Sequence, residues 1–347
     1  MKYKKKILSL DKYINEALYN KKFGYYMKKN PFGKKGDFLT SPNISVLFSE
    51  MIAIWIIAFW ESLKCPKKFN LIELGAGNGA MMKEIVNTFK KFPNIKNSCK
   101  IYIYEKSIYL KNIQKKNLKE KNIVWLKDLN KLPKNPNIFI ANEFFDALPI
   151  KQFIKKKNKW YERNVEFFKP DKSRFLDILT NIKKLEKKIG LKVSYKQKFI
   201  EFSPLANNYL KIISKKIKLS KGGLLIIDYG YFDENMKNTL QSVLNHKYND
   251  VLNNFGNADI TYSINFNLLK KIINKFNLKT VGITSQGKFL TNLGILKRAE
   301  IISINLPFSK KADIYYRLKR LIHKNFMGEV FKVMFISKKN INFKLGF

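Results

Sequence analysis

Three glycines lie in one short turn directly after an apolar run, in the segment Gly75-Ala76-Gly77-Asn78-Gly79. Because glycine has no side chain, such a turn allows the backbone to approach a ligand closely. An acidic residue, Glu73, precedes the turn, and this combination favours a methyltransferase. It disfavours a nicotinamide dehydrogenase, because the Gly-x-Gly-x-x-Gly spacing of a dinucleotide site is absent. The alternative is a tight turn between a strand and a helix that binds nothing.

Two further acids follow the next two expected strands. Glu105 ends the second strand, where a carboxylate can accept hydrogen bonds from both ribose hydroxyls of a bound adenosine. Asp128 and its neighbour Leu129 follow the third strand, where the amino group of adenine is commonly recognised. The alternatives are an ordinary surface carboxylate at Glu105 and a helix N-cap at Asp128. We predict that these residues contact the adenosine part of a cofactor.

The segment after the fourth expected strand, Ala141 to Pro149, contains two carboxylates that flank two aromatic rings. Open α/β sheets place their ligand crevice at this end of the strands. Glu143 and Asp146 are three residues apart, so in a helical turn they would share a face and could clamp one cationic group. Phe144 or Phe145 could wall a transfer channel. Alternatively, both rings belong to the core and Asp146 is a cap.

The elements that must position these residues follow a simple pattern. From residue 70 onward, short apolar runs alternate with stretches of helical periodicity, which is typical of βαβ units. This predicts an α/β fold of the class I methyltransferase type, with a doubly wound, mostly parallel seven-stranded sheet, an N-terminal helical cap and insertions. We expect strands at 70–74, 100–104, 123–126, 138–141, 223–228, 278–285 and 331–337, and helices at 10–19, 44–63, 80–89, 204–219, 287–293 and 312–324.

The same pattern predicts four parts along the chain. An N-terminal helical cap is followed by one half of the core, by a β-rich insertion whose hairpin turns at Lys157-Asn158, and by the second half of the core. The second half carries a polar segment, up to about residue 263, that we expect to cover the site. The predicted bounds of the four parts are 1–68, 69–149, 150–202 and 203–347.

The net charge and the cysteine content exclude few classes of function. The chain has 68 lysines and arginines against 26 acids, a net charge of +42, and the lysines are spread along the whole sequence. A solvated lysine coat and a surface for nucleic acid or acidic lipid are both compatible with this, since only clustering would distinguish them. Cys65 and Cys99 have no metal-ligand spacing, so we expect no metal site. With no secretory segment and no apolar run long enough to cross a bilayer, we predict a cytoplasmic protein without a transmembrane segment.

Several uncommon strings occur in order along nearly the whole chain. They are Gly36-Asp37-Phe38 with Thr40-Ser41-Pro42, Glu73 to Gly79, Asn142 to Pro149, Gly222-Gly223 through Asp228-Tyr229-Gly230, Thr239-Leu240 with His246, Ala258 to Thr261, and Met327-Gly328-Glu329. In these strings the chain resembles the MidA-type methyltransferases, a family that includes a mitochondrial complex I assembly protein arginine methyltransferase. One departure is Pro42-Asn43, where the family has Pro-Glu.

The resemblance implies S-adenosyl-L-methionine as the cofactor and a protein arginine as the methyl acceptor, with a complex I subunit as the candidate partner. A guanidinium is always protonated and a poor nucleophile, so carboxylates that orient it are expected. We therefore predict Glu143 and Asp146 as catalytic residues. His246 either assists proton removal or hydrogen-bonds the long loop. The predicted cofactor contacts are Glu73, Gly75, Gly77, Gly79, Glu105, Asp128, Leu129, Asn142, Thr40 and Ser41.

Two other functions remain open at this point. A methyltransferase that acts on RNA or on a small molecule would suit the basic charge, and Asn142 with Phe144 could imitate a base-stacking platform. A Lys-rich groove that leads to Glu143 would favour nucleic acid, whereas an acidic channel mouth would favour arginine. A non-catalytic assembly factor that keeps the fold is the second alternative, with Asn43 as its only support. The sequence does not indicate an oligomeric state.

Overall fold

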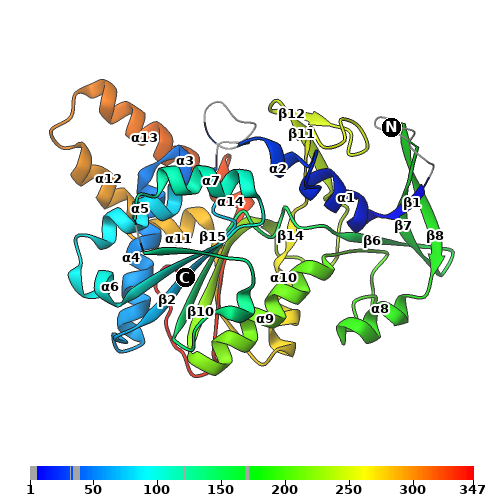
Figure 1. Cartoon of the computed structure of the whole chain (residues 1–347), viewed down its shortest axis with the longest axis horizontal. Helices are drawn as coiled ribbons and strands as arrows, with labels where there is room; N and C mark the ends of the chain where they lie inside the picture. The colour runs from blue at the N-terminus through cyan, green and yellow to red at the C-terminus, as the bar shows by residue number, and fades with distance from the viewer. Residues whose placement is uncertain (1–5, 32, 34–39, 121, 169–171) are drawn as a thin grey trace. The chain divides into compact units, whose positions relative to one another are not determined.

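A computed structural model describes residues 6–31, 33, 40–120, 122–168 and 172–347 (Figure 1). Contacts divide the chain into two compact units, each assembled from three separate segments. Unit 1 comprises Met1–Lys29, Phe145–Lys211 and Tyr231–Ile272, and unit 2 comprises Asn30–Phe144, Ile212–Gly230 and Ile273–Phe347. The four-part division along the chain stays a prediction.

Unit 2 is built around one large sheet whose strands follow the order β15-β16-β10-β5-β2-β3-β4. All neighbours from β10 to β4 pair in parallel, and β16 pairs antiparallel with both β10 and β15. The predicted class I methyltransferase fold with a mostly parallel sheet is therefore confirmed, and the seven predicted strands form the main path of a sheet that has an eighth, two-residue strand off this path. The strands are β2 (Phe69–Leu74), β3 (Cys99–Tyr104), β4 (Ile123–Leu126), β5 (Asn137–Asn142), β10 (Gly222–Tyr231), β15 (Lys279–Ser285) and β16 (Phe331–Ser337).

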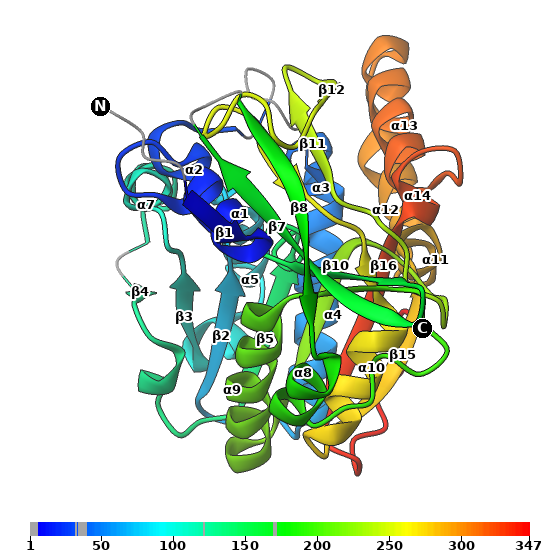
Figure 2. The same cartoon turned by 90° about the vertical axis from the view of Figure 1, so that its right-hand side faces the viewer.

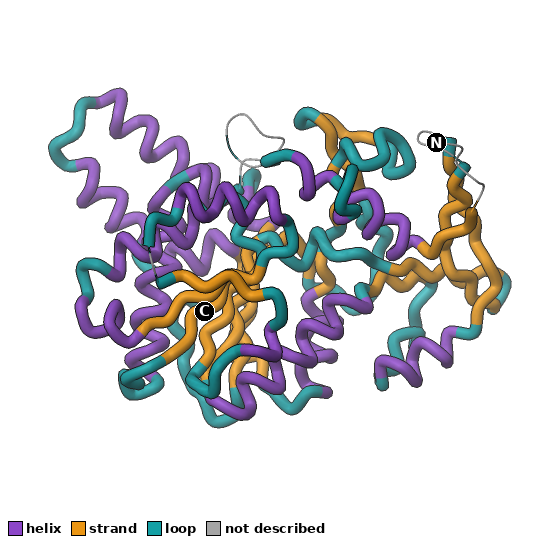
Figure 3. Tube along the Cα trace, in the orientation of Figure 1, coloured by secondary structure: helices purple, strands orange, loops and turns teal. Residues whose placement is uncertain are grey.

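The central strands of this sheet are fully buried because helices lie on both of its faces (Figure 3). Helix α4 (Val46–Ser62) is almost entirely apolar and packs against α5 (Ala80–Phe89). One continuous helix was predicted over residues 44–63, but the helix is interrupted at Ser45. The backbone of Ser45 is extended, and its hydroxyl accepts a hydrogen bond from the Leu47 N–H at 3.3 Å, so Ser45 ends α3 (Ser41–Ile44) and caps α4.

The parallel strands bring the predicted site residues to one edge of the sheet. Strands β2, β3, β4 and β5 point the same way, so the turns that follow them lie at their common carboxyl edge (Figure 2). These turns begin at Gly75, Glu105, Lys127 and Glu143. The sheet topology therefore assembles residues that are up to 68 positions apart in the sequence, from Gly75 to Glu143.

Unit 1 contains a sheet of order β1-β7-β6-β9, with β8 paired to β7. Its hairpin turns at Lys157-Asn158, as predicted, and both residues have positive φ (44° and 63°), which a two-residue turn of this kind requires. The segment predicted as a polar loop forms a second, three-stranded sheet. The strands of unit 1 are β1 (Lys6–Ser9), β6 (Lys151–Lys156), β7 (Lys159–Phe167), β8 (Ser173–Thr180), β9 (Phe199–Phe202), β11 (Gln241–Leu244), β12 (Lys247–Asn249), β13 (Asp259–Thr261) and β14 (Ile264–Asn265).

The remaining helices follow the predicted pattern in part. Helix α1 (Leu10–Tyr19) has its predicted bounds, and α13 (Phe308–Ile322) begins four residues before the predicted start at residue 312. None of the helices in the described ranges is long and apolar enough to cross a membrane. The other helices are α2 (Tyr25–Lys28), α6 (Pro93–Ser98), α7 (Ile108–Asn117), α8 (Ile182–Ile189), α9 (Pro204–Ser220), α10 (Phe266–Lys275), α11 (Gln286–Asn292), α12 (Ile295–Ser303), α14 (Met327–Val330) and the 3₁₀ turn η1 (Leu129–Lys131).

Candidate active site

The glycine turn after β2 needs glycine for its backbone conformation. Gly75, Gly77 and Gly79 have φ values of 67°, 53° and 82°, in the left-handed region that other residues rarely adopt. A Cβ atom on Gly75 would also lie only 2.8 Å from the ring of Phe144. Phe144 therefore packs closely on the turn, which then leads into α5 at Ala80.

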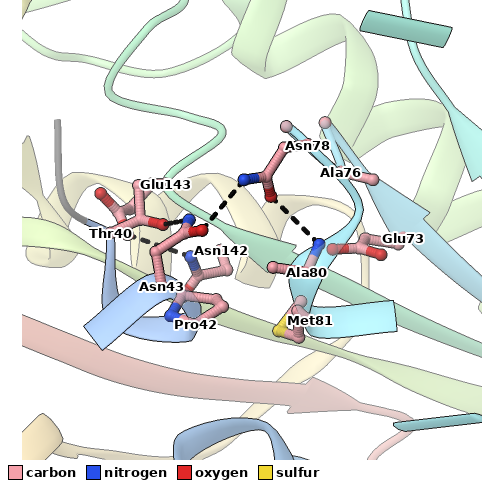
Figure 4. A pocket seen from close by; sticks show the side chains of 12 residues that line it. Thr40, Pro42, Asn43, Glu73, Ala76, Asn78, Ala80, Met81, Asn142 and Glu143 are labelled. Atoms are coloured by element: carbon pink, nitrogen blue, oxygen red, sulfur yellow. Dashed lines mark hydrogen bonds between the residues drawn. The ribbon is translucent and has the colours of Figure 1, made fainter. Parts of the chain in front are cut away.

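A cavity lies between this turn and the segments that follow β5 and precede α3 (Figure 4). Two of its oxygens, Oε2 of Glu73 and Oδ1 of Asn142, are buried and have no hydrogen-bond partner among the described residues. Buried acceptors without partners destabilise a folded protein, so they indicate that a ligand with donor groups belongs here. Both oxygens fit the amino group and hydroxyls of S-adenosylmethionine. The cavity is lined by Thr40, Pro42, Asn43, Glu73, Gly75, Ala76, Gly77, Asn78, Ala80, Met81, Asn142 and Glu143.

Burial changes the acidity of the carboxyl groups in the cavity. It raises the pKa of Glu73 to about 8, and the nearby charge of Glu105 adds to this effect. It also raises the pKa of Glu143 to about 7, which hydrogen bonds from Asn142 and from the Ser41 backbone partly oppose. A cation bound in the cavity would favour the ionised form of both groups.

Glu105 belongs to a buried hydrogen-bond network beside the glycine turn. Its carboxylate accepts hydrogen bonds from the Ser107 N–H at 2.9 Å and from Nε2 of Gln114 at 3.0 Å. The same Gln114 nitrogen donates to the carbonyl oxygen of Gly77 at 2.9 Å, and Oε1 of Gln114 accepts from the Trp125 ring N–H at 2.9 Å. Burial raises the pKa of Glu105, although these hydrogen bonds oppose the rise.

Sequence reasoning missed Gln114, although it joins the glycine turn to the predicted ribose carboxylate. Its side chain is fully buried on α7. The signal was present, because Gln114 lies four residues after Leu110, on the same buried helix face. A polar residue at a position where helical periodicity predicts an apolar one indicates a buried hydrogen-bond network.

Glu143 lies at the end of β5 in a conformation that the sequence did not predict. Its backbone N–H still bonds to the Ile227 carbonyl at 2.9 Å, and its φ is +50°. Residues 143–146 therefore form no helical turn, and the predicted helical face is wrong. Oε1 of Glu143 accepts hydrogen bonds from Nδ2 of Asn142 at 3.1 Å and from the Ser41 N–H at 3.4 Å.

The segment that contains Thr40 and Ser41 forms another wall of the cavity. Thr40 precedes α3, and its hydroxyl accepts a hydrogen bond from Asn43 at 2.7 Å. Oδ1 of Asn43 in turn accepts from Nδ2 of Asn78, in the glycine turn, at 2.9 Å. The Ser41 hydroxyl donates to the buried Gln286 at 3.2 Å. Asn43, where the chain departs from the family pattern, thus tethers this wall to the turn. Gly36-Asp37-Phe38 lies outside the described residues.

Asp128 and Leu129 follow β4. Oδ1 of Asp128 accepts hydrogen bonds from the backbone N–H of Asn130 at 2.9 Å and from its side chain at 3.0 Å. The backbone hydrogen bond is the main reason why the pKa of Asp128 is lowered. Asp128 thus caps the short turn η1, which agrees with the alternative prediction of an N-cap at this residue. Leu129 is buried. Neither observation tests a role in adenine binding.

The other two predicted catalytic residues belong to unit 1, whereas Glu143 belongs to unit 2. Asp146 is buried, and its carbonyl oxygen accepts a hydrogen bond from the Tyr262 N–H at 3.2 Å. His246 is exposed, with φ +62°, in the two-residue turn between β11 and β12. That position explains His246 as a turn residue and gives no support for proton transfer. The clamp formed by Glu143 with Asp146 stays a prediction.

Comparisons with known proteins identify the family to which the chain belongs. Residues 51–284 match the model of a family described as "Putative S-adenosyl-L-methionine-dependent methyltransferase". The mitochondrial protein arginine methyltransferase NDUFAF7 of Xenopus tropicalis is 31% identical over 342 residues, which cover 91% of this chain and 77% of that protein. The human protein of the same name is 30% identical over 350 residues, which cover 93% and 78%.

A solved structure has the same fold. It is a "likely methyl transferase" from Burkholderia thailandensis bound to S-adenosyl-homocysteine, with a TM-score of 0.81 and 22% identity. The match covers 98% of this chain and 90% of the other.

One prediction is corrected by the relatives. A cytoplasmic location was predicted from the lack of a secretory segment. The relatives from Xenopus tropicalis and human are both named as mitochondrial proteins, which contradicts that prediction. The N-terminal residues on which the prediction was based include 1–5, which lie outside the described part of the chain.

The fold, the glycine turn and the family match lead to the same conclusion. The family model covers the glycine turn, Glu105 and Glu143, and the relatives from Xenopus tropicalis and human are 31% and 30% identical to this chain over the aligned residues. The sequence prediction of an enzyme that uses S-adenosylmethionine is thereby confirmed. This chain belongs to the S-adenosyl-L-methionine-dependent methyltransferase family whose model it matches.

Proposed function

We propose that the enzyme methylates an arginine side chain of a protein. One observation carries this proposal: the carboxylate of Glu143 lines the same cavity as the glycine turn. Among the described residues that line this cavity, Glu73 and Glu143 are acidic and none is lysine or arginine. Such a lining suits a cationic acceptor better than a polyanion. The names of the relatives, which are protein arginine methyltransferases, support the same acceptor.

The proposed chemistry assigns Glu143 two tasks. S-adenosylmethionine supplies a methyl group on a sulfonium sulfur when it is bound. The Glu143 carboxylate orients the guanidinium towards that group, and it accepts the proton that the acceptor nitrogen releases. A pKa of about 7 suits proton transfer near neutral pH. Asn142 and the Ser41 N–H hold Oε1 of Glu143, which leaves Oε2 for the acceptor.

The predicted cofactor contacts are proposed with the same division of roles. Glu105, which Gln114 and the Ser107 N–H hold in place, would accept hydrogen bonds from the ribose. Glu73 and Asn142 have unpartnered buried oxygens that would accept hydrogen bonds from the rest of the cofactor. Asp128 and Leu129 are proposed for adenine, and Thr40 and Ser41 for the cavity wall opposite the glycine turn.

A complex I subunit remains the candidate partner that the family resemblance implies. Acceptor identity can be tested by incubating the full chain with labelled S-adenosylmethionine and a cell lysate, followed by acid hydrolysis of the labelled material. We expect the label in protein, as methylated arginine. Label in RNA or in a small molecule would contradict the proposal while leaving the methyltransferase assignment intact.

A further inference from the structure

Helices α12 (Ile295–Ser303) and α13 (Phe308–Ile322) form a hairpin in unit 2 (Figure 1). The residues at its tip expose apolar side chains. We call Ile301, Ile304, Leu306 and Phe308 the hairpin tip. Their exposed fractions are 51%, 61%, 37% and 86%. Single exposed apolar residues are common on proteins, but four within eight residues form a patch that indicates a binding surface.

The exposed face of α13 continues this patch. Phe308, Ala312 and Tyr316 are spaced four residues apart, so they lie on one face of the helix, and Tyr315 is exposed beside them. The opposite face packs inward through Leu318 and Leu321. The helix is thus apolar on two faces, although only one of them contacts the core.

Basic residues occur along both helices of the hairpin. Residues 295–324 contain eight lysines and arginines but only two acids. Both acids are already paired, Glu300 with Lys297 at 3.0 Å and Asp313 with Arg317 at 2.8 Å. Lys310 and Lys311 follow the tip directly, and no carboxylate in the described part of the chain forms an ion pair with either of them. The surface therefore presents a positive charge next to exposed apolar side chains.

We propose that the hairpin tip binds the surface of an anionic phospholipid bilayer. Aliphatic and aromatic side chains of such a tip insert at the boundary between headgroups and acyl chains, while neighbouring lysines attract the acidic headgroups. Ile304 and Leu306 lie in the connection between the two helices, Ile301 lies in α12 and Phe308 begins α13, and all four side chains are exposed. An exposed apolar end of this kind suits insertion into a membrane better than contact with a flat protein surface. The lysines supply the charge complementarity that selects an anionic bilayer over a neutral one.

Vesicle sedimentation of the full chain tests this proposal. The probes are vesicles of phosphatidylcholine alone and vesicles of phosphatidylcholine mixed with phosphatidylglycerol. We expect binding to the mixed vesicles, at least about tenfold weaker binding to the neutral ones, and weaker binding to the mixed vesicles at high salt. Equal binding to both kinds of vesicle, or binding to neither, would overturn the proposal.

Two matched pairs of variants locate the contact. Phe308→Ser removes an aromatic side chain that is 86% exposed, and Tyr248→Ser removes one that is 87% exposed in unit 1. We expect Phe308→Ser to weaken binding to the mixed vesicles about tenfold, with an unchanged melting temperature, and Tyr248→Ser to have no effect on binding. Lys310→Glu should weaken binding in the same way, and Lys247→Glu should not.

The variants also separate a membrane from a protein partner. If Phe308→Ser and Tyr248→Ser weakened vesicle binding equally, the tip would not be the contact, and the proposal would be wrong. If Phe308→Ser left vesicle binding intact but slowed methylation of a protein acceptor, the tip would serve a protein, which also overturns the membrane proposal.

Discussion

Each unit of the molecule contains a buried glutamate that is hydrogen-bonded by a buried glutamine. In unit 2, Nε2 of Gln114 donates to Glu105 at 3.0 Å, and in unit 1, Nε2 of Gln152 donates to Glu201 at 2.7 Å. Burial raises the pKa of both glutamates, that of Glu201 to about 7. By chemistry and burial alone, either pair could belong to an active site.

The two glutamate–glutamine pairs differ in the other residues to which they are hydrogen-bonded. Gln114 also bonds to the carbonyl of Gly77, in the turn that lines the cavity. Gln152 instead bonds to Asn238, and Glu201 accepts hydrogen bonds from Thr239, so this network ties β6 and β9 to the segment before β11. A raised pKa therefore does not identify a functional carboxylate unless the group also borders a ligand cavity or, like Glu105, is hydrogen-bonded to a residue that holds the cavity lining.

The largest expected effect concerns the glycine turn. Gly77→Val should abolish binding of S-adenosylmethionine, because valine is strained at φ +53° and its side chain would enter the cavity. Gly190→Val is a matched control, since Gly190 has φ +62° at the end of α8 in unit 1. The control should lose stability but keep its cofactor affinity. Calorimetry that gave wild-type affinity for a folded Gly77→Val protein would contradict the assignment of this turn.

The next effect concerns the carboxylates themselves. Glu105→Ala should weaken cofactor binding by roughly 1.5–3 kcal/mol, because it removes a charged acceptor for the ribose hydroxyls. The same change at Glu201 should leave the cofactor affinity unchanged and lower the melting temperature. Equal affinity losses in the two variants would show that the comparison between the two networks is wrong.

Replacing the two glutamines should affect cofactor affinity in unit 2 but not in unit 1, with a smaller loss of affinity than replacing Glu105. Gln114→Met keeps the size of the side chain but removes the hydrogen bonds that Gln114 makes with Glu105, Gly77 and Trp125. We expect about tenfold weaker binding of S-adenosyl-homocysteine together with a lower melting temperature. Gln152→Met should lower only the melting temperature. A Gln114→Met protein that lost stability but bound the ligand normally would reduce Gln114 to a purely structural role.

The smallest effect is a pH dependence of stability in unit 1. The pKa of Glu201 is about 7 in the folded protein and near 4.5 in the unfolded chain, so the unfolded state ionises first as the pH rises. The contribution of Glu201 to stability is therefore fully present below pH 4.5 and is lost as the pH rises to about 7. Denaturant titrations should show that Glu201→Gln gains stability relative to the wild type across this window. A difference that is independent of pH would exclude a raised pKa.

The sequence predicted the sheet of unit 2 well because its strands are buried on both faces. Every residue of β2 and β5 is buried, Gly75 follows β2 directly, and the four apolar residues of β5 lie between two asparagines. The short strands β11, β12 and β13 span only three or four residues, too few to display an alternating pattern, so they were predicted as a loop.

The candidate site was predictable where a residue directly follows a strand. Glu105 and Glu143 were predicted in this way, and Glu73 was predicted because it lies within β2, one residue before the strand ends. The conformation of Glu143 and the tether between Asn43 and Asn78 were not, because they depend on contacts between distant segments. Helical spacing also failed after β5, since the backbone there continues the strand pairing and then turns sharply.

The most direct test of the account is Glu143→Gln, with Glu201→Gln as its matched control. Both replacements keep size and hydrogen-bonding capacity, and both remove a carboxyl group whose pKa is raised to about 7. Turnover with an arginine-containing protein acceptor and affinity for S-adenosyl-homocysteine should be measured on the same preparations. We predict that Glu143→Gln lowers turnover by orders of magnitude at nearly unchanged affinity, and that Glu201→Gln alters neither. Full turnover per folded molecule of Glu143→Gln would contradict the proposed role of Glu143 in arginine methylation.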